Sequence, residues 1–129
     1  MLFIAIGIGG GLGALLRYLS IRFVNAFDFF HNTLPWGTVA VNCLGSFLIG
    51  FLTPVFAVCT PPLHGKALLI TGFLGGYTTF STYTLETAEY FMRGALKQAL
   101  CTMLLQNVLG IAFVMAGMAL AKLVLKIRP

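Results

Sequence analysis

Long stretches without a charged side chain constrain this chain more than any other feature. Residues 29 to 65 form one such stretch, without a single Asp, Glu, Lys or Arg. A helix needs about 20 apolar residues to cross the hydrocarbon core of a bilayer. Only 9% of the whole chain is charged, against about 25% in soluble domains. So few charges would not cover the surface of a soluble domain, and the sequence therefore predicts a membrane protein.

Four membrane spans are expected from the positions of the charged residues and prolines. Asp28, His31 and Asn32 belong to the linker after the first span, and Pro61 and Pro62 end the second. Each span is expected to be a helix, because unpaired strand edges are not tolerated in lipid and the chain is too small for a closed barrel. We therefore expect a single all-α transmembrane domain with spans at about residues 2–24, 36–59, 66–91 and 98–121.

Composition excludes several other functions. The chain carries eight Lys and Arg against three Asp and Glu, but the basic residues are scattered and do not form a nucleic-acid footprint. Cys43, Cys59 and Cys101 lack the paired spacing of a zinc site or a disulfide framework. Within the spans no Ser/His/Asp set, Cys/His pair or carboxylate dyad converges. We therefore expect neither nucleic-acid binding nor enzymatic activity.

Lysine and arginine are balanced between the two sides of the membrane. With four spans, one side receives Lys66, Lys122, Lys126 and Arg128, and the other receives Arg17, Arg22, Arg93 and Lys97. Orientation follows the Lys and Arg bias, so a zero bias predicts either weakly determined insertion or insertion in both orientations, and we expect the second. The alternative is that one loop outweighs the others and fixes a single topology.

Small residues recur four positions apart in three spans. Such pairs let helix backbones approach closely in lipid, where packing replaces hydrophobic association. The pairs predict tight packing of these helices, and they are Gly9 with Gly13, Ser46 with Gly50, and Gly72 with Gly76.

The third span has an unusual composition for a lipid-facing helix. Residues 72–86 read GFLGGYTTFSTYTLE, with three glycines and five Ser or Thr. Gly75, Gly76 and the pair Thr78 and Thr79 favour a local break in the helix. Broken backbone persists at membrane depth only where it is buried in protein or lines a cavity or ion site. Freed carbonyls suit a hard cation and freed amides an anion; a kink for packing alone is the alternative.

Polar and aromatic side chains within the spans are the candidate functional groups. Thr38, Asn42 and Ser46 lie one helical turn apart, so they share a stripe. The Asn42 amide has two donors and an acceptor that lipid cannot satisfy, and it serves either an interhelical hydrogen bond or a transport function. Phe80 and Tyr83 share a face once the helix resumes, a spacing that is usual for packing.

Three segments resemble the signature blocks of the Fluc/CrcB family of fluoride channels. They are GGGLGALLRY (residues 9–18), PWGTVAVNCLGSFLIG (35–50) and GFLGGYTTFSTYTLE (72–86). The third block is highly specific, whereas the first alone would be a weak match. Chain length, four spans and balanced loop charge agree with the family, so the resemblance covers the whole chain.

The resemblance implies a fluoride-selective channel of the bacterial inner membrane, through which cytoplasmic fluoride leaves down its electrochemical gradient. It also implies a homodimer of oppositely oriented subunits in lipid, with two fluoride pathways and a structural sodium ion at the centre. Sodium would bind the backbone carbonyls of Gly75 and Thr78, and Arg17 would supply a vestibule charge. The residues expected along the anion pathway are Asn42, Thr79, Phe80, Ser81, Thr82, Tyr83 and Asn107.

Two features depart from the family pattern. The family commonly has Phe where this chain has Tyr83, and the added hydroxyl either donates to the anion or merely enlarges the ring. The fourth span usually carries a polar track, whereas the matching stripe of Asn107, Ile111 and Met115 keeps only its first polar member. Either Thr and Ser of the third span supply the missing donors, or conduction is reduced.

A small dual-topology, proton-coupled multidrug exporter is the alternative function. Such a protein would use an intramembrane Glu in the middle of its first span as a switch. Glu86 and Glu89 lie instead at the end of the third span, which counts against this alternative.

Overall fold

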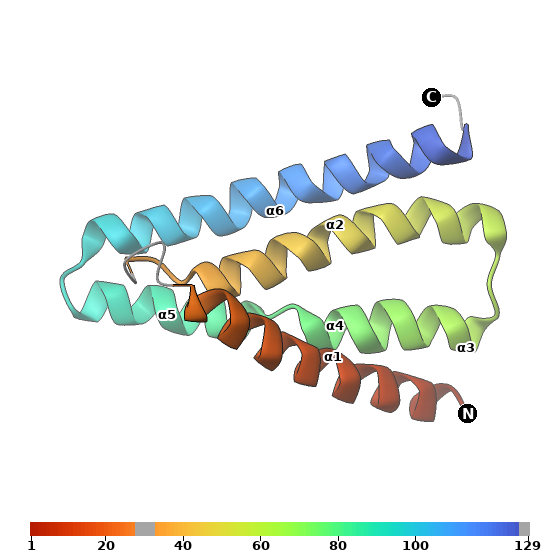
Figure 1. Cartoon of the computed structure of the whole chain (residues 1–129), viewed down its shortest axis with the longest axis horizontal. Helices are drawn as coiled ribbons and strands as arrows, with labels where there is room; N and C mark the ends of the chain where they lie inside the picture. The colour runs from red at the N-terminus through yellow and green to blue at the C-terminus, as the bar shows by residue number, and fades with distance from the viewer. Residues whose placement is uncertain (28–32, 127–129) are drawn as a thin grey trace.

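The computed structural model describes residues 1–27 and 33–126, which form helices joined by short connections (Figure 1). Asp28, His31 and Asn32 of the expected linker, and Arg128 of the charge count, lie outside the described residues. The elements are α1 (Leu2–Ala26), α2 (Trp36–Cys59), α3 (Leu63–Lys66), the π-helix η2 (Ala67–Leu74), α4 (Gly75–Tyr77), α5 (Phe80–Met92) and α6 (Leu96–Leu125).

The chain runs back and forth four times along the long axis of the molecule (Figure 1). Among the residues that the structure describes, α1, α2 and α6 are long and apolar enough to cross a membrane as single helices. The remaining pass is divided, because α3, η2 and α4 follow one another directly and α5 begins only after an extended interruption. The predicted all-α fold with a broken third span is confirmed.

The ends of two passes differ from the expected spans. The helix α3 begins at Leu63, directly after Pro62, and so starts three residues before the expected span. The helix α6 runs from Leu96 to Leu125 and takes Lys97 and Lys122 into its end turns. Long basic side chains at helix ends can extend to the interface, so charge alone does not mark where such a helix begins.

Glycines bring α1 into backbone contact with η2 and α4. A Cβ on Gly72 would lie 2.7 Å from the carbonyl oxygen of Ile6 and 3.0 Å from the Cα of Gly9. A Cβ on Gly13 would collide with the backbone of Phe73 and Tyr77. The tight packing predicted from the glycine pairs of the first and third spans is therefore confirmed.

A second close contact joins α2 to α6. Gly50 lies against the backbone of Val114, and Gly117 lies against the backbone of Phe47 and Phe51. Gly50 belongs to a predicted small-residue pair, whereas Gly117 was not singled out by the sequence. This contact decides which face of α6 turns toward the interior.

The interior of the subunit is small and partly polar. Thr38 of α2 and Thr102 of α6 are fully buried together with Val41, Ala99 and Ala121. Large apolar side chains are instead mostly exposed along α1 and α6, as expected for surfaces that face lipid. Polar groups therefore gather between α2, α5 and α6.

Candidate functional site

The third span is interrupted at two threonines. Thr78 has φ −81° and ψ 159°, and Thr79 has φ −147° and ψ 117°, so both residues are extended. Gly75 and Gly76 were also expected to take part in the break, but both belong to helix α4. Gly76 packs instead against the backbone of Gly10. The break is thus formed by β-branched residues, which favour extended backbone, and Gly76 serves close packing.

Asn42 replaces the helix hydrogen bonds that are lost at the break. The backbone N–H of Thr79 would normally donate to the Gly75 carbonyl four residues earlier, but it donates to Asn42 Oδ1 at 2.8 Å. The Thr79 carbonyl accepts from Asn42 Nδ2 at 3.0 Å. Thr79 also accepts a hydrogen bond from the Thr82 backbone N–H through its side chain, which caps α5. Asn42 therefore makes the interhelical hydrogen bonds that its sequence position suggested.

Gln106 is the further partner of Asn42, and the sequence analysis did not identify it. Asn42 Nδ2 also donates to Gln106 Oε1 at 3.0 Å, and the Gln106 residue is 8% exposed. The polar stripe on α6 had been assigned to Asn107, Ile111 and Met115, but the last two are 64% and 65% exposed. The inward polar face is formed by Thr102 and Gln106. A primary amide in an otherwise apolar span was the available signal.

The neighbouring residue Asn107 contacts α5. Its Nδ2 donates to the Tyr83 hydroxyl at 3.1 Å and to the Met103 carbonyl at 2.8 Å. The Tyr83 ring lies edge to face with the Phe80 ring, with centroids 5.5 Å apart and planes at 71°. Phe80 and Tyr83 therefore share a face, and Tyr83 is buried whereas Phe80 is 75% exposed.

These side chains border one groove of about 340 Å³ beside the break. It brings together seven residues that were expected at the ion sites: Asn42, Gly75, Thr78, Thr79, Phe80, Tyr83 and Asn107. Ser81 and Thr82 do not border it. The Thr82 hydroxyl lies 3.0 Å from the Thr79 hydroxyl, and Ser81 is exposed with its hydroxyl 3.3 Å from the same group.

Arg17 connects α1 to the break. Its Nη1 donates to the Thr78 carbonyl at 3.1 Å, so the guanidinium lies against the interrupted helix. The Gly75 carbonyl has lost its usual helix donor to Asn42. Backbone carbonyl oxygens are ligands of the kind that hard cations prefer. The carbonyls of Gly75 and Thr78, which are expected to bind sodium, are therefore ligands of a suitable kind for this ion. One lone pair of the Thr78 carbonyl oxygen is occupied by Arg17.

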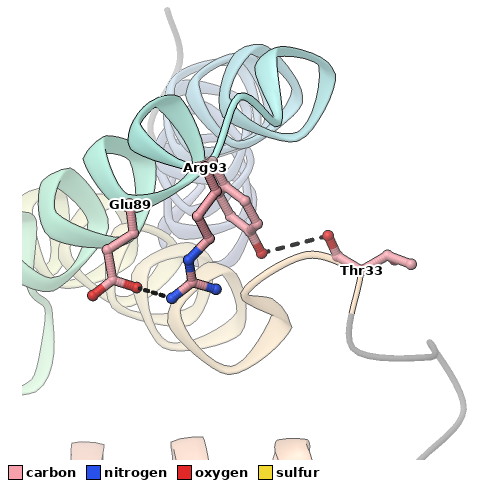
Figure 2. A network of polar contacts seen from close by, with 4 residues as sticks. Thr33, Glu89 and Arg93 are labelled. Carbon is pink, nitrogen blue, oxygen red and sulfur yellow. Dashed lines mark hydrogen bonds and ion pairs between the residues drawn. The ribbon is translucent and has the colours of Figure 1, made fainter.

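The acidic residues of α5 lie away from the groove. Glu86 Oε1 accepts from the buried Thr38 hydroxyl at 2.8 Å. Glu89 forms an exposed ion pair with Arg93 at 3.3 Å, and Tyr90 donates to the Thr33 carbonyl at 3.4 Å close by (Figure 2). Exposed pairs of this kind contribute about 0–1 kcal/mol, so they fasten the end of α5 only weakly.

Comparisons with known proteins give a consistent result. The family model described as CrcB-like protein, Camphor Resistance (CrcB), matches residues 4–118, which include the whole groove. A protein named Fluoride-specific ion channel FluC from Hydrogenobaculum sp. (strain Y04AAS1) is 44% identical, over 91% of this chain and 94% of its own. Proteins of the same name from Hahella chejuensis (strain KCTC 2396) and Aquifex aeolicus (strain VF5) are 40% and 41% identical, over 93% and 92% of this chain and 94% of each relative.

Proposed function

Because this chain belongs to the CrcB family, we propose that it is a fluoride-specific ion channel that lets fluoride leave the cytoplasm down its electrochemical gradient. The three relatives described above carry that name at 40% identity or more over nearly their whole length. The structural observation that supports the proposal is the broken third span, whose polar groups border a groove instead of being sealed by packing. The protein is thus an integral membrane channel and not an enzyme.

Hydrogen-bond donors and ring edges along the groove suit a small anion. The edge of an aromatic ring is positive, so the edges of Phe80 and Tyr83 can face an anion without repelling it. The Tyr83 hydroxyl oxygen accepts a hydrogen bond from Asn107. The Tyr83 hydroxyl proton is not used in this bond and can point toward an ion. Fixed donors replace the hydration shell of an ion that they fit. Fluoride accepts such hydrogen bonds better than the larger chloride, and a narrow path of donors therefore selects it.

A second copy of the chain completes the pathway in the proposed assembly. The groove is open on one side, since Phe80 at its rim is 75% exposed, and an open groove in lipid does not conduct ions. The balance of four basic residues on each side supports a partner of opposite orientation. The membrane that this antiparallel homodimer would occupy is the inner membrane of a bacterial cell.

Sodium is proposed at the axis of this dimer. The carbonyls of Gly75 and Thr78 from both subunits would hold it, and the ion would supply positive charge that balances their converging dipoles. Arg17 donates a hydrogen bond to the same Thr78 carbonyl oxygen. One lone pair of this oxygen is therefore occupied by Arg17, and the other remains for the ion. Within each subunit, Arg17 and Asn42 hold the break in place on either side.

Fluoride release from liposomes tests the function. Purified protein is reconstituted into vesicles loaded with potassium fluoride, and external fluoride is followed with an electrode after valinomycin is added to balance charge. We expect rapid release of fluoride without a proton gradient, and little release from vesicles loaded with chloride. Release that requires a proton gradient would instead indicate an exporter, and no release at all would contradict the channel.

A further inference from the structure

A second groove, of about 550 Å³, lies between α1 and α2. Its two hydroxyl groups bond to each other, because Tyr77 donates to the Ser20 hydroxyl at 3.3 Å. The rest of its lining is hydrocarbon, so the groove suits an apolar chain better than a polar ligand. The residues that line it include Leu19, Ser20, Phe23, Ala40, Leu44 and Tyr77.

The second groove lies on the side of α2 away from the groove beside the break. Asn42 and Ser46 border the groove beside the break, and Ala40 and Leu44 each precede one of them by two residues. Two residues correspond to about 200° of rotation around a helix. Because the second subunit is proposed at the groove beside the break, the second groove is left facing lipid. Leu44 is accordingly 48% exposed.

Arg22 lies beside this groove and carries a charge without a carboxylate partner. Its neighbour Phe23 is one of the lining residues. Arg22 Nη1 donates to the Tyr18 hydroxyl at 3.2 Å, and the guanidinium carbon lies 5.9 Å from the centre of the Tyr18 ring. Within the described part of the chain the one ion pair joins Glu89 to Arg93. The positive charge of Arg22 is therefore not neutralised by the protein there.

The bonds of Arg22 hold its charge against α1, toward the middle of the membrane. The helix ends at Ala26, and Tyr18 lies one turn farther from that end than Arg22. Basic side chains near helix ends usually extend to the interface instead. A charge at membrane depth is costly unless an opposite charge pairs with it. A guanidinium matches the oxygens of a phosphate group, and most of its donors remain available after the bond to Tyr18.

We propose that the second groove binds an anionic phospholipid, with the lipid phosphate on Arg22 and one acyl chain along Leu19, Phe23, Ala40 and Leu44. This site is additional to the proposed channel function. A choline headgroup would bring a second cation close to Arg22, whereas an anionic headgroup brings none, so the charge favours the anionic lipid. In the proposed antiparallel dimer, the two sites lie in opposite leaflets.

The fluorescence of Trp36 tests the site in the intact protein. Trp36 is the only tryptophan of the chain, and it shares one face of α2 with Ala40 and Leu44 at spacings of four residues. Bromine atoms on an acyl chain quench tryptophan emission on contact. The protein is placed in nanodiscs of phosphatidylcholine and phosphatidylglycerol, with one lipid brominated at a time. Phosphatidylglycerol should quench at about fivefold lower mole fraction, as expected for one basic residue near an anionic lipid.

Two outcomes of this measurement would overturn the proposal. Equal quenching by the two lipids would show that no anionic headgroup is selected. The absence of quenching by either lipid would show that protein, such as the second subunit, covers the groove. Fluoride release is not measured in this experiment, so a failure of the proposed channel function is recognised separately in the liposome assay.

A charge variant with a matched control assigns the headgroup contact. Arg22→Gln should remove the preference for phosphatidylglycerol while quenching by phosphatidylcholine persists. Lys97→Gln removes one charge from an exposed residue that is expected on the same side of the membrane and does not line the groove, and it should keep the preference. A preference that persists in Arg22→Gln would refute the role of Arg22.

A second pair of variants places the acyl chain. Ala40→Leu fills part of the groove and should reduce quenching of Trp36 by both lipids. Ala57→Leu makes the same change at the exposed far end of α2 and should leave quenching as in the wild type. Unchanged quenching in Ala40→Leu would show that the acyl chain lies elsewhere. If Ala40→Leu does not fold, the wild type and Arg22→Gln decide, because Arg22 is exposed and its replacement leaves the packing of the helices intact.

Discussion

At the scale of single residues, the Asn42 amide holds the site together. It accepts one hydrogen bond and donates two, and these bonds join α2 to the break and to α6. Asn42 therefore both holds the helices together and positions groups along the groove, because Thr79 and Gln106, which it orients, border the groove. Changes at Asn42 should therefore affect transport more than folding of the individual helices.

Asn42→Asp is expected to reduce fluoride release by about 1,000-fold. The carboxylate places a fixed negative charge beside the path, and at ~4 Å two unit charges repel by about 4 kcal/mol at an effective dielectric constant of 20. It also turns an acceptor toward the Thr79 carbonyl and Gln106 Oε1. The measurement is fluoride efflux from liposomes. Asn25→Asp, the same change on the exposed end of α1, should leave efflux unchanged. Wild-type efflux in Asn42→Asp would exclude Asn42 from the pathway.

Tyr83 separates the contribution of a ring edge from that of a hydroxyl. Tyr83→Phe should keep fluoride efflux within about threefold, because the ring edge remains and Asn107 retains its bond to the Met103 carbonyl. Tyr83→Ile removes the positive edge, and efflux should fall by about tenfold, the upper range of such ring interactions. If Tyr83→Phe instead loses about 10- to 150-fold, one hydrogen bond to a charged group has been removed and the hydroxyl is the ligand.

The sequence predicts some of these residues and misses others for a physical reason. Asn42 stands out because an amide side chain within a span is unusual, whereas Phe80 and Tyr83 are expected at the pathway only from the family resemblance, and all three border the groove. Gln106 has the same chemistry, but its importance depends on which face of α6 turns inward. That rotation is set by the contact of Gly50 and Gly117 with the opposite backbone, which no pattern within α6 alone reveals.

At the scale of elements, small residues determine how close the helices lie. The composition of residues 72–86 predicts a break, and the break is present, yet Gly76 lies in a helix and packs against Gly10. Sequence reasoning could not divide these roles, because glycine permits both unusual backbone and close approach. The threonines were the better indicator of the extended residues, since their side chains restrict the backbone.

Gly72→Val should destabilise the contact between α1 and η2. Its Cβ would lie 2.7 Å from the Ile6 carbonyl and 3.0 Å from the Gly9 Cα, and backbone cannot move aside as a flexible side chain can. Overpacking of this kind costs about 1–3 kcal/mol, measured as a lower midpoint of thermal or detergent-induced unfolding. A Cβ on Gly7 of α1 would have no atom of the described residues within 4 Å, so Gly7→Val is the control. Equal midpoints for the two variants would contradict the close packing.

At the scale of the whole molecule, balanced charge is expected to give two orientations. Reporter tags on the C-terminus should be detected on both sides of the membrane in comparable amounts, because the Lys and Arg counts are equal. Two lysines added at the C-terminus should shift the population toward one orientation. Detection of every tag on one side in the unmodified chain would rule out an antiparallel pair.

Gly75 tests where the second subunit lies. Among the described residues of one subunit, its Cβ would meet only the Ile70 carbonyl, at an ordinary contact distance of 3.9 Å. Its backbone is helical, with φ −63° and ψ −34°, and valine is accepted there at least as well as glycine. Gly75→Val should therefore preserve helical content by circular dichroism, as should Thr78→Ser, which keeps the bond to the Leu74 carbonyl.

If a second subunit packs against Gly75, the Gly75→Val variant should fold as a subunit but fail to form the dimer. If the Gly75 carbonyl of each subunit approaches the other across the axis, the valine side chains collide, and the protein should elute as a monomer and release no fluoride. Thr78→Ser should remain dimeric and active, because the backbone carbonyl that would bind sodium is unchanged. Gly76→Val provides the opposite case, since its Cβ would meet the Gly10 backbone within the same subunit and should disrupt the fold itself. A dimeric, conducting Gly75→Val would show that this helix turn does not face the partner, and the sodium site would then have to lie elsewhere.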